Sequence, residues 1–494
     1  MLLIIKSQRT KWLLGLVIFL CCLYAILLIP DSAPPVPPAG EKVPFAWNRD
    51  DYWSSLETQF KEMRHIGCIN LSSRISDGFT RLDTLLARLQ TDTLAPSSSL
   101  FSSIEGKIFE LGMLLAACPE RFPDYIKTFS RLRTLSKDQS IRWDMNSQDA
   151  RDCIYRLLYG GRTAIEEIML QSPEEIIPKV AFENDEPSVT PSAAILGVKI
   201  HSGDILVSRG GAPTSALIAR GNDYPGNFSH VALVYVDDST GTVSIIESHI
   251  EKGVAIATID DYLKDTKLRV MVLRLRSDLS QMQSDPMLPH KAASYALQRA
   301  KTEHIPYDFA MDAAEPSKLF CSEVVSQAYN HVGIKLWTAL SHISSPGAKA
   351  WLSAFGVRNF TTEEPSDLEY DPQLRVVAEW RDYQTLYKDR VDNAVVDIML
   401  ENADKGEPLG YDWYMLPVAR MAKAYSTIIN QVNLVGPVPE GMNAAAALRN
   451  KWFSRKHQKI KDKVLTLAEQ FRNTNGYSPP YWELIKLARQ ANMR

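Results

Sequence analysis

The stretch SKLFCSEVVSQAY, residues 317–329, predicts a helix with a cysteine in its first turn. Apolar residues recur at helical spacing from Phe320 to Val332, so one face should be buried. We expect this helix to start near Ser317 and to end at Gly333, a residue type that often caps helices. Cys321 would then lie in the first turn, where the peptide dipoles favour thiolate over thiol. An inert buried cysteine fits the helix equally well, so a nucleophile requires a base nearby.

A candidate base begins the apolar stretch SHVALVY, residues 229–235. This run is typical of a central strand, and His230 at its start could face a cleft at the sheet rim. Glu247 ends the next predicted strand and could orient the imidazole and stabilise its charged form. His249 lies two residues later and could share the face of Glu247. A lone histidine is more often structural, so the pairing of these two strands decides the argument.

The register of the two strands follows from parity. If Val236 pairs with Val243 across a hairpin, Ala232 lies opposite Glu247 and His230 lies one diagonal step away on the same face. A shift by two residues would place His230 and Glu247 directly opposite each other. A shift by one would place them on opposite faces and remove the contact.

The region around these residues predicts an α+β unit. Two helices, 291–303 and 317–333, follow a series of short β-rich runs separated by turns. The predicted strands are 204–208, 231–236, 243–246, 254–257 and 270–275.

The flanking regions predict helices. Apolar residues recur at three and four spacing in 52–66, 75–89, 104–118 and 148–170, which indicates a helical bundle without chemistry of its own. Residues 346–494 are expected to be mostly helical as well. The basic run 452–463 is interpreted as a solvated helix face rather than a partner site.

The N-terminus contains an uncharged run, WLLGLVIFLCCLYAILLI, over residues 12–29. This length suits a helix that spans a bilayer, and Lys6, Arg9 and Lys11 precede it, which predicts that the body lies on the extracytoplasmic side. A cleaved signal peptide is the competing interpretation; the run exceeds a usual signal core, and no small-x-small site follows closely. The prolines that follow predict an extended spacer.

Composition and cysteines limit the remaining options. A net charge of −3 gives no electrostatic reason to expect nucleic acid as a partner. The absence of C-x-x-C and H-E-x-x-H patterns gives no support for a metal site, and no cofactor is expected. If Cys321 stays free, one disulfide at most can form among Cys68, Cys118 and Cys153, and the sequence leaves the pair open.

The order of these motifs resembles the permuted papain-like cysteine hydrolases. The similar residues are HSGDILV (201–207), SHVALVY (229–235), IES with a later GV (246–254), PYDF (306–309) and FCSEVV (320–325), and the nearest branch is the YiiX-like one, related to NlpC-type peptidases and lecithin retinol acyltransferase-like enzymes. The resemblance covers about residues 198–345. It implies that Cys321 is the nucleophile, His230 the base and Glu247 the orienting group. It also implies that Tyr307 and Asp308 lie near the cleft.

The resemblance and the patterning together predict an α+β protein with a circularly permuted papain-like domain between mainly helical regions. A peptide or acyl-amide substrate of the cell envelope is expected, cleaved through an acyl-thioester on the periplasmic side of the inner membrane. An acyltransferase or lipid esterase on the same thiol and a membrane-anchored scaffold without catalysis remain alternatives. The predicted segments are a cytoplasmic N-terminus (1–11), anchor (12–29), linker (30–46), helical domain (47–180), linker (181–197), catalytic domain (198–345) and helical extension (346–494).

Overall fold

The computed structural model describes residues 2–30, 42–183, 185–430 and 434–493. A seven-stranded sheet at its centre has the order β1-β11-β8-β4-β5-β6-β7, and every neighbouring pair is antiparallel. The strands are β1 (Val180–Phe182), β4 (Ile205–Gly210), β5 (His230–Val236), β6 (Val243–His249), β7 (Gly253–Ala257), β8 (Lys267–Leu275) and β11 (Leu374–Trp380). Two-stranded sheets are formed by β2 (Ser192–Ile195) with β3 (Val198–His201), and by β9 (Ser341–His342) with β10 (Thr361–Thr362).

The five predicted strands correspond to β4, β5, β6, β7 and β8. The structure adds β1 and β11 at one edge of the sheet. Both added strands lie outside residues 198–345, so the sheet extends beyond the predicted limits of the catalytic domain. β11 also interrupts a region expected to be mostly helical. It pairs with β8 along its length, from Leu374 opposite Leu275 to Trp380 opposite Val270. This long-range pairing buries an apolar strand that has no local helical partner.

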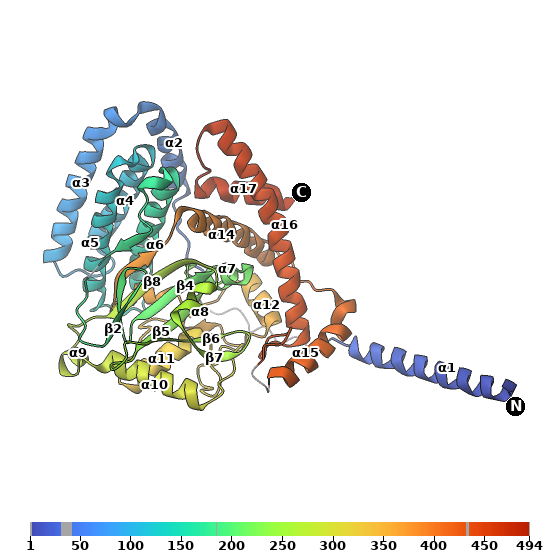
Figure 1. Ribbon diagram of the computed structural model, residues 1–494. Helices are drawn as coiled ribbons and strands as arrows, with labels where there is room; N and C mark the ends of the chain where they lie inside the picture. Colours follow the sequence, from blue (N-terminus) through green and yellow to red (C-terminus); the bar gives the residue numbers. More distant parts are fainter. Residues whose placement is uncertain (1, 31–41, 184, 431–433, 494) are drawn as a thin grey trace.

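Helices α10 (Leu288–Thr302) and α11 (Cys321–His331) cover one face of the sheet (Figure 1). Leu233 and Met271 of the sheet and Val325 of α11 share this buried core. The helix predicted from Ser317 begins instead at Cys321, because Pro316 and Ser317 form a turn and Phe320, the N-cap residue, has an extended backbone. Short helices nearby are α7 (Pro213–Arg220), α8 (Ile259–Lys264), α9 (Ser280–Ser284), α12 (Pro346–Phe355) and α13 (Asp367–Tyr370).

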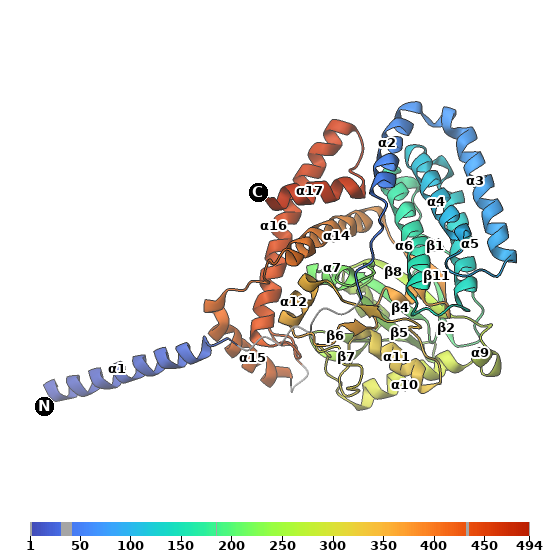
Figure 2. The ribbon, with the colours of Figure 1, turned by 180° about the vertical axis from the view of Figure 1, so that it is seen from behind.

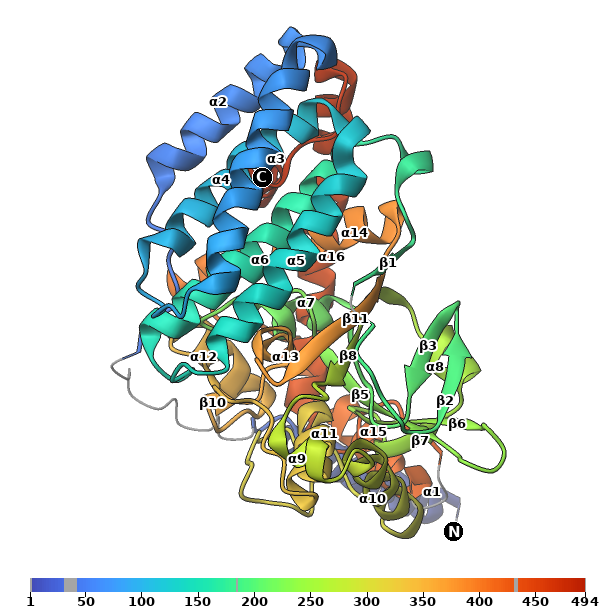
Figure 3. The ribbon, with the colours of Figure 1, turned by 90° about the vertical axis from the view of Figure 1, so that its left-hand side faces the viewer.

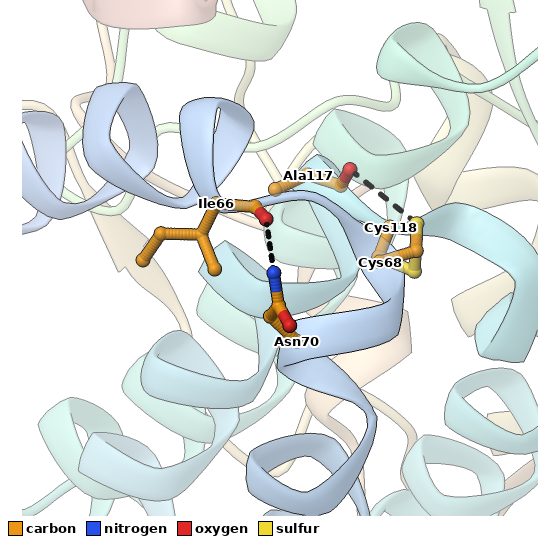
Figure 4. Close-up of a disulfide and its surroundings, with 5 residues drawn as sticks. All are labelled: Ile66, Cys68, Asn70, Ala117 and Cys118. Atoms are coloured by element: carbon orange, nitrogen blue, oxygen red, sulfur yellow. Dashed lines mark hydrogen bonds between the residues drawn. A yellow bond between two sulfur atoms is a disulfide. The ribbon is translucent and has the colours of Figure 1, made fainter.

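The region predicted as a helical bundle forms a separate layer of long helices beside the sheet (Figure 3). Four of them correspond to the segments named from the sequence, and α5 lies within the same region expected to be helical. They are α2 (Asp50–Ile66), α3 (Cys68–Thr91), α4 (Ser99–Ala117), α5 (Phe122–Ser140) and α6 (Gln148–Gln171), with the 3₁₀ turns η1 (Pro119–Arg121) and η2 (Glu174–Ile176). Of the pairings left open, the structure has the Cys68–Cys118 disulfide, which joins the start of α3 to the end of α4 (Figure 4). Asn70 donates to the Ile66 carbonyl beside it, 3.0 Å away.

A buried network of charges joins this bundle to the sheet layer. Arg162 of α6 donates to Glu369 of α13 at 2.7 Å, and both side chains are fully buried. Arg133 of α5 contacts Glu379 of β11 at 2.7 Å. Because an unpaired charge in such a place is costly, these contacts fix how the bundle sits on the sheet.

Two of the C-terminal helices, α14 and α16, pack against α7 and α12, while α15 packs on α16, and α17 packs on α14 and α16 (Figure 2). The C-terminal helices are α14 (Tyr383–Asp404), α15 (Leu416–Asn430), α16 (Ala444–Asn475) and α17 (Tyr481–Met493), with the 3₁₀ turn η3 (Trp413–Met415). In the predicted basic run, Lys461 is paired with Asp392 at 2.6 Å, so this part of α16 packs on α14 rather than being a wholly solvated face.

Helix α1 (Leu2–Leu27) projects from the body beside α15 (Figure 1). Its segment Thr10–Leu27 is long and apolar enough to cross a membrane, with a mean hydropathy of 2.1 and no buried residues. A signal sequence has the same properties. Most of the spacer predicted over residues 30–46 lies outside the described residues, which omit 31–41.

Candidate active site

The strand register that joins His230 to Glu247 is the one expected from parity. β5 and β6 pair with Val236 opposite Val243 and Ala232 opposite Glu247. His230 lies on the diagonal from Glu247, and its Nε2 is 2.6 Å from Glu247 Oε2. The imidazole is therefore held through Nε2, which leaves Nδ1 as the ring nitrogen for a second partner.

Cys321 is that second partner. It is the first residue of α11, and it lies within hydrogen-bonding reach of His230. Burial of the imidazole lowers the pKa of His230, but hydrogen bonds and charge interactions with Cys321 and Glu247 outweigh it and raise this pKa to about 9. The site therefore favours a charged imidazolium next to the Glu247 carboxylate.

Glu247 receives a second histidine. His249 Nε2 lies 3.0 Å from Glu247 Oε1, so each carboxylate oxygen has an imidazole partner. Burial of Glu247 raises its pKa. The hydrogen bonds and charge interactions with the two histidines lower it by more, so the pKa of Glu247 lies far below its ordinary value. Glu247 is thus a fixed negative charge behind His230 at any neutral pH. The sequence placed His249 on this face but assigned it no contact.

The segment that precedes Cys321 in the chain is hydrogen-bonded to β6, which contains Glu247, and to the neighbouring strand β7. Ser248 Oγ donates to the carbonyl of Leu319 at 2.6 Å. Leu319 N–H donates to Pro306 O at 3.0 Å, and Val254 N–H donates to Ile305 O at 2.9 Å. These hydrogen bonds fix the position of Cys321 relative to the edge of the sheet.

Gly253 is required for this close approach. Its φ is +74°, and a Cβ atom there would lie 2.1 Å from the carbonyl oxygen of Ile305. A side chain would therefore push β7 away from the segment that leads to Cys321.

Tyr307 and Asp308 both lie beside Cys321, on the wall of one cavity. Burial and the neighbouring acidic groups, Cys321 among them, raise the pKa of Tyr307 well above its usual value, so its hydroxyl stays protonated. Asp308 accepts a hydrogen bond from Ala310 N–H at 2.9 Å and another from Asp312 N–H. Its carboxylate shapes this loop.

The cavity that contains Cys321 has a volume of about 130 Å³. Its walls come from segments far apart in the sequence, including α7, α12 and the start of α16. Most of the side chains are apolar, for example Leu217, Phe355 and Met442. No sequence pattern predicts this cavity, because its walls depend on how α7, α12 and α16 pack.

Three further carboxyl groups near Cys321 were not identified from the sequence. Burial raises the pKa of Glu323 to about 8 and that of Glu363 to about 7, while Glu364 is raised well above its ordinary value. Glu323 Oε2 accepts a hydrogen bond from Phe320 N–H at 3.0 Å, which secures the first turn of α11. Because Glu323 and Glu364 are mainly neutral near pH 7, they add little negative charge beside the thiol.

Within the described residues, no group of three or more His, Cys, Asp or Glu side chains is arranged to hold a metal ion. The arrangement at Cys321 instead has the parts that acyl transfer to a thiol needs: a thiol at a helix start, an imidazole and an orienting carboxylate.

Comparison with known proteins agrees with this geometry. Residues 199–378 match the model of the permuted papain-like amidase enzyme family YaeF/YiiX, C92. The match includes Cys321, His230 and Glu247 and reaches into β11, beyond the limit of 345 expected from the sequence. No curated protein and no solved structure matches the chain.

Proposed function

We propose that Cys321 is the nucleophile of this permuted papain-like amidase domain, with His230 as its acid and base and Glu247 as the orienting group. The domain is that of a cysteine hydrolase family acting on amide bonds. The observation that supports the assignment most strongly is the 2.6 Å contact from Glu247 to His230, with Cys321 on the remaining side of the imidazole.

The proposed reaction begins with a thiolate–imidazolium pair. The sulfur of Cys321 attacks the carbonyl carbon of an amide, and the oxyanion accepts a hydrogen bond from the Cys321 N–H, one of the unpaired donors of the first helical turn. The imidazolium of His230 gives its proton to the amine nitrogen as the C–N bond breaks. Water, deprotonated by the now neutral His230, then attacks the thioester and releases the acid and the thiol.

Alkylation of the full-length protein tests the nucleophile. Iodoacetamide at mildly acidic pH should modify Cys321 quickly, and His230→Ala should slow this at least tenfold. Cys153 is the internal control, because burial raises its thiol pKa and keeps it unreactive. Labelling of Cys321 no faster than that of Cys153, and unchanged by His230→Ala, would favour the non-catalytic scaffold.

The apolar cavity favours an acyl group as the part of the substrate next to the scissile bond. Leu217, Phe355 and Met442 are among the apolar side chains that form most of its wall. We expect a dodecanoyl 4-nitroanilide to be hydrolysed with a higher kcat/KM than the acetyl compound. Equal values for both would remove the argument from the cavity and leave a peptide as substrate.

An acyltransferase would use the same thioester. Adding an amine or lysolipid acceptor separates the two activities, because a transferase should give a large increase in 4-nitroaniline release together with an acylated acceptor. A hydrolase should release free acid at a rate that the acceptor leaves unchanged.

We also propose that α1 remains as a membrane anchor and holds the body on the extracytoplasmic side. The basic residues that precede the uncharged run within α1 support this orientation, and the Cys68–Cys118 disulfide suits an oxidising compartment. The full-length protein should stay in the membrane pellet after alkaline carbonate extraction, with its body open to protease only from the outer side. Release of a chain shortened at its N-terminus would indicate a cleaved signal.

A further inference from the structure

The surface of α15 contains an exposed apolar stripe outside the matched domain. Val418, Met421, Tyr425 and Ile428 follow at three- and four-residue spacing, and each side chain is exposed by 46–65%. Tyr414 continues the stripe at one end. Apolar residues on one exposed helix face at this density mark an interaction surface rather than a solvated one.

The polar residues of α15 do not interrupt this stripe. Arg420 Nη1 donates to the carbonyl of Leu27 at 2.9 Å, and Lys423 Nζ donates to Pro439 O at 2.9 Å. Both cations are half-buried and turned toward other parts of the protein. Apart from Tyr425, whose ring belongs to the stripe, Thr427 is the only exposed residue with a polar side chain among the described residues of α15.

The position of α15 points to the occupant of this surface. The last turn of α1 lies against it: Tyr24 donates to the carbonyl of Tyr414 at 2.9 Å, and Arg420 holds Leu27 (Figure 1). Since the apolar segment of α1 ends at Leu27, α15 begins where the anchor would leave the hydrocarbon region.

The composition also fits a bilayer interface. Trp413, Tyr414 and Tyr425 are exposed at this level, and tryptophan and tyrosine gather where membranes meet water. At 15 residues α15 is about 22 Å long, too short to span a bilayer but suitable for lying on one.

We infer that α15 lies in the lipid headgroup region with its Val418–Ile428 stripe buried in the bilayer. This rests on the proposed anchoring by α1. Beside the stripe, α15 packs through Ala422 against Val438 and Met442, and Met442 lines the cavity of Cys321. The membrane surface is thereby separated from the cavity wall by one helix, so an acyl chain in the outer leaflet lies close to the thiol.

Site-specific fluorescence of the full-length chain tests this inference. Ile428→Cys is labelled with bimane in a background where Cys21, Cys22 and Cys321 are serine, and the protein is reconstituted into phosphatidylcholine vesicles. Thr84→Cys, on exposed α3 far from α1, is the matched control. Doxyl-labelled lipids should quench the label at 428 at least threefold more strongly than that at 84, and aqueous iodide should show the reverse order.

The outcomes separate this inference from its premise. A label at 428 quenched by iodide as strongly as at 84, in protein that resists carbonate extraction, refutes the interfacial helix and leaves the anchor standing. Shielding from iodide without lipid quenching also refutes it, because a protein surface, such as a second copy, would then cover the stripe. Protein released by carbonate removes the anchor itself. Ser102→Cys provides a second control if the label at 84 disturbs folding, because it is exposed on another helix.

Discussion

Glu247→Gln should lower the pKa of His230 by removing the charge behind the imidazole while keeping an oxygen that can accept its hydrogen bond. The pKa of His230 is raised from 6.5 to about 9, against an opposing effect of burial. Hydrogen bonds and charge interactions with Cys321 and Glu247 raise the pKa of His230, and each interaction with Cys321 is larger than the corresponding one with Glu247. Because a nearby opposite charge typically shifts a pKa by about 1–3 units, loss of the Glu247 charge should lower the pKa of His230 by about 1–2 units, or about 1.4–2.7 kcal/mol.

The sign of the pH effect follows from the role of the proton. Because the leaving amine takes its proton from imidazolium, hydrolysis should fall as pH rises through the pKa of His230. The wild-type limb should lie near pH 9, and that of Glu247→Gln should lie 1–2 units lower. At pH 8 the variant should therefore lose up to about tenfold in kcat/KM, with a smaller loss at pH 6.

The assay is the pH profile of kcat/KM for a 4-nitroanilide between pH 5 and 10. Glu251→Gln is the matched control, since this nearby carboxylate is exposed and should leave the alkaline limb in place. An alkaline limb unchanged in Glu247→Gln would refute the reasoning. So would a uniform loss at all pH values, which would indicate misplacement of the imidazole rather than a change in its pKa.

Three predictions concern stability and assembly of the site. Arg162→Leu should lower the free energy of unfolding by about 3–5 kcal/mol in urea titration, because the buried Glu369 would lose its 2.7 Å partner and keep only the 3.4 Å contact with Arg133; a loss below 1 kcal/mol would contradict this. Replacing Cys68 and Cys118 by serine should cost about 4 kcal/mol, because the bond closes a loop with a sequence separation of 50, and dithiothreitol should reproduce the effect in wild-type protein only. Gly253→Ala should slow alkylation of Cys321 by at least tenfold, whereas Gly241→Ala, also at positive φ but with open space around it, should not; equal rates would show that the contact with Ile305 does not position the thiol.

The sequence predicted the centre of the candidate site because its geometry depends on local rules. A strand alternates its side chains with a period of two, so a hairpin between residues 236 and 243 fixes which side chains share a face. His230 and Glu247 were therefore expected together, and β5 and β6 have that register. The place of Cys321 at a helix start followed from apolar spacing, within four residues of the observed start.

Only the tertiary structure decided what surrounds this centre. β11 reads locally like part of a helical region, and its partner β8 lies about a hundred residues earlier, so no periodicity could predict the pairing. The cavity beside Cys321 combines α7, α12 and α16, and its shape depends on how those helices pack. The same holds for the stripe on α15: spacing defines an apolar face, but contact with α1 determines which way it points, because burial is a property of the folded chain and not of the segment.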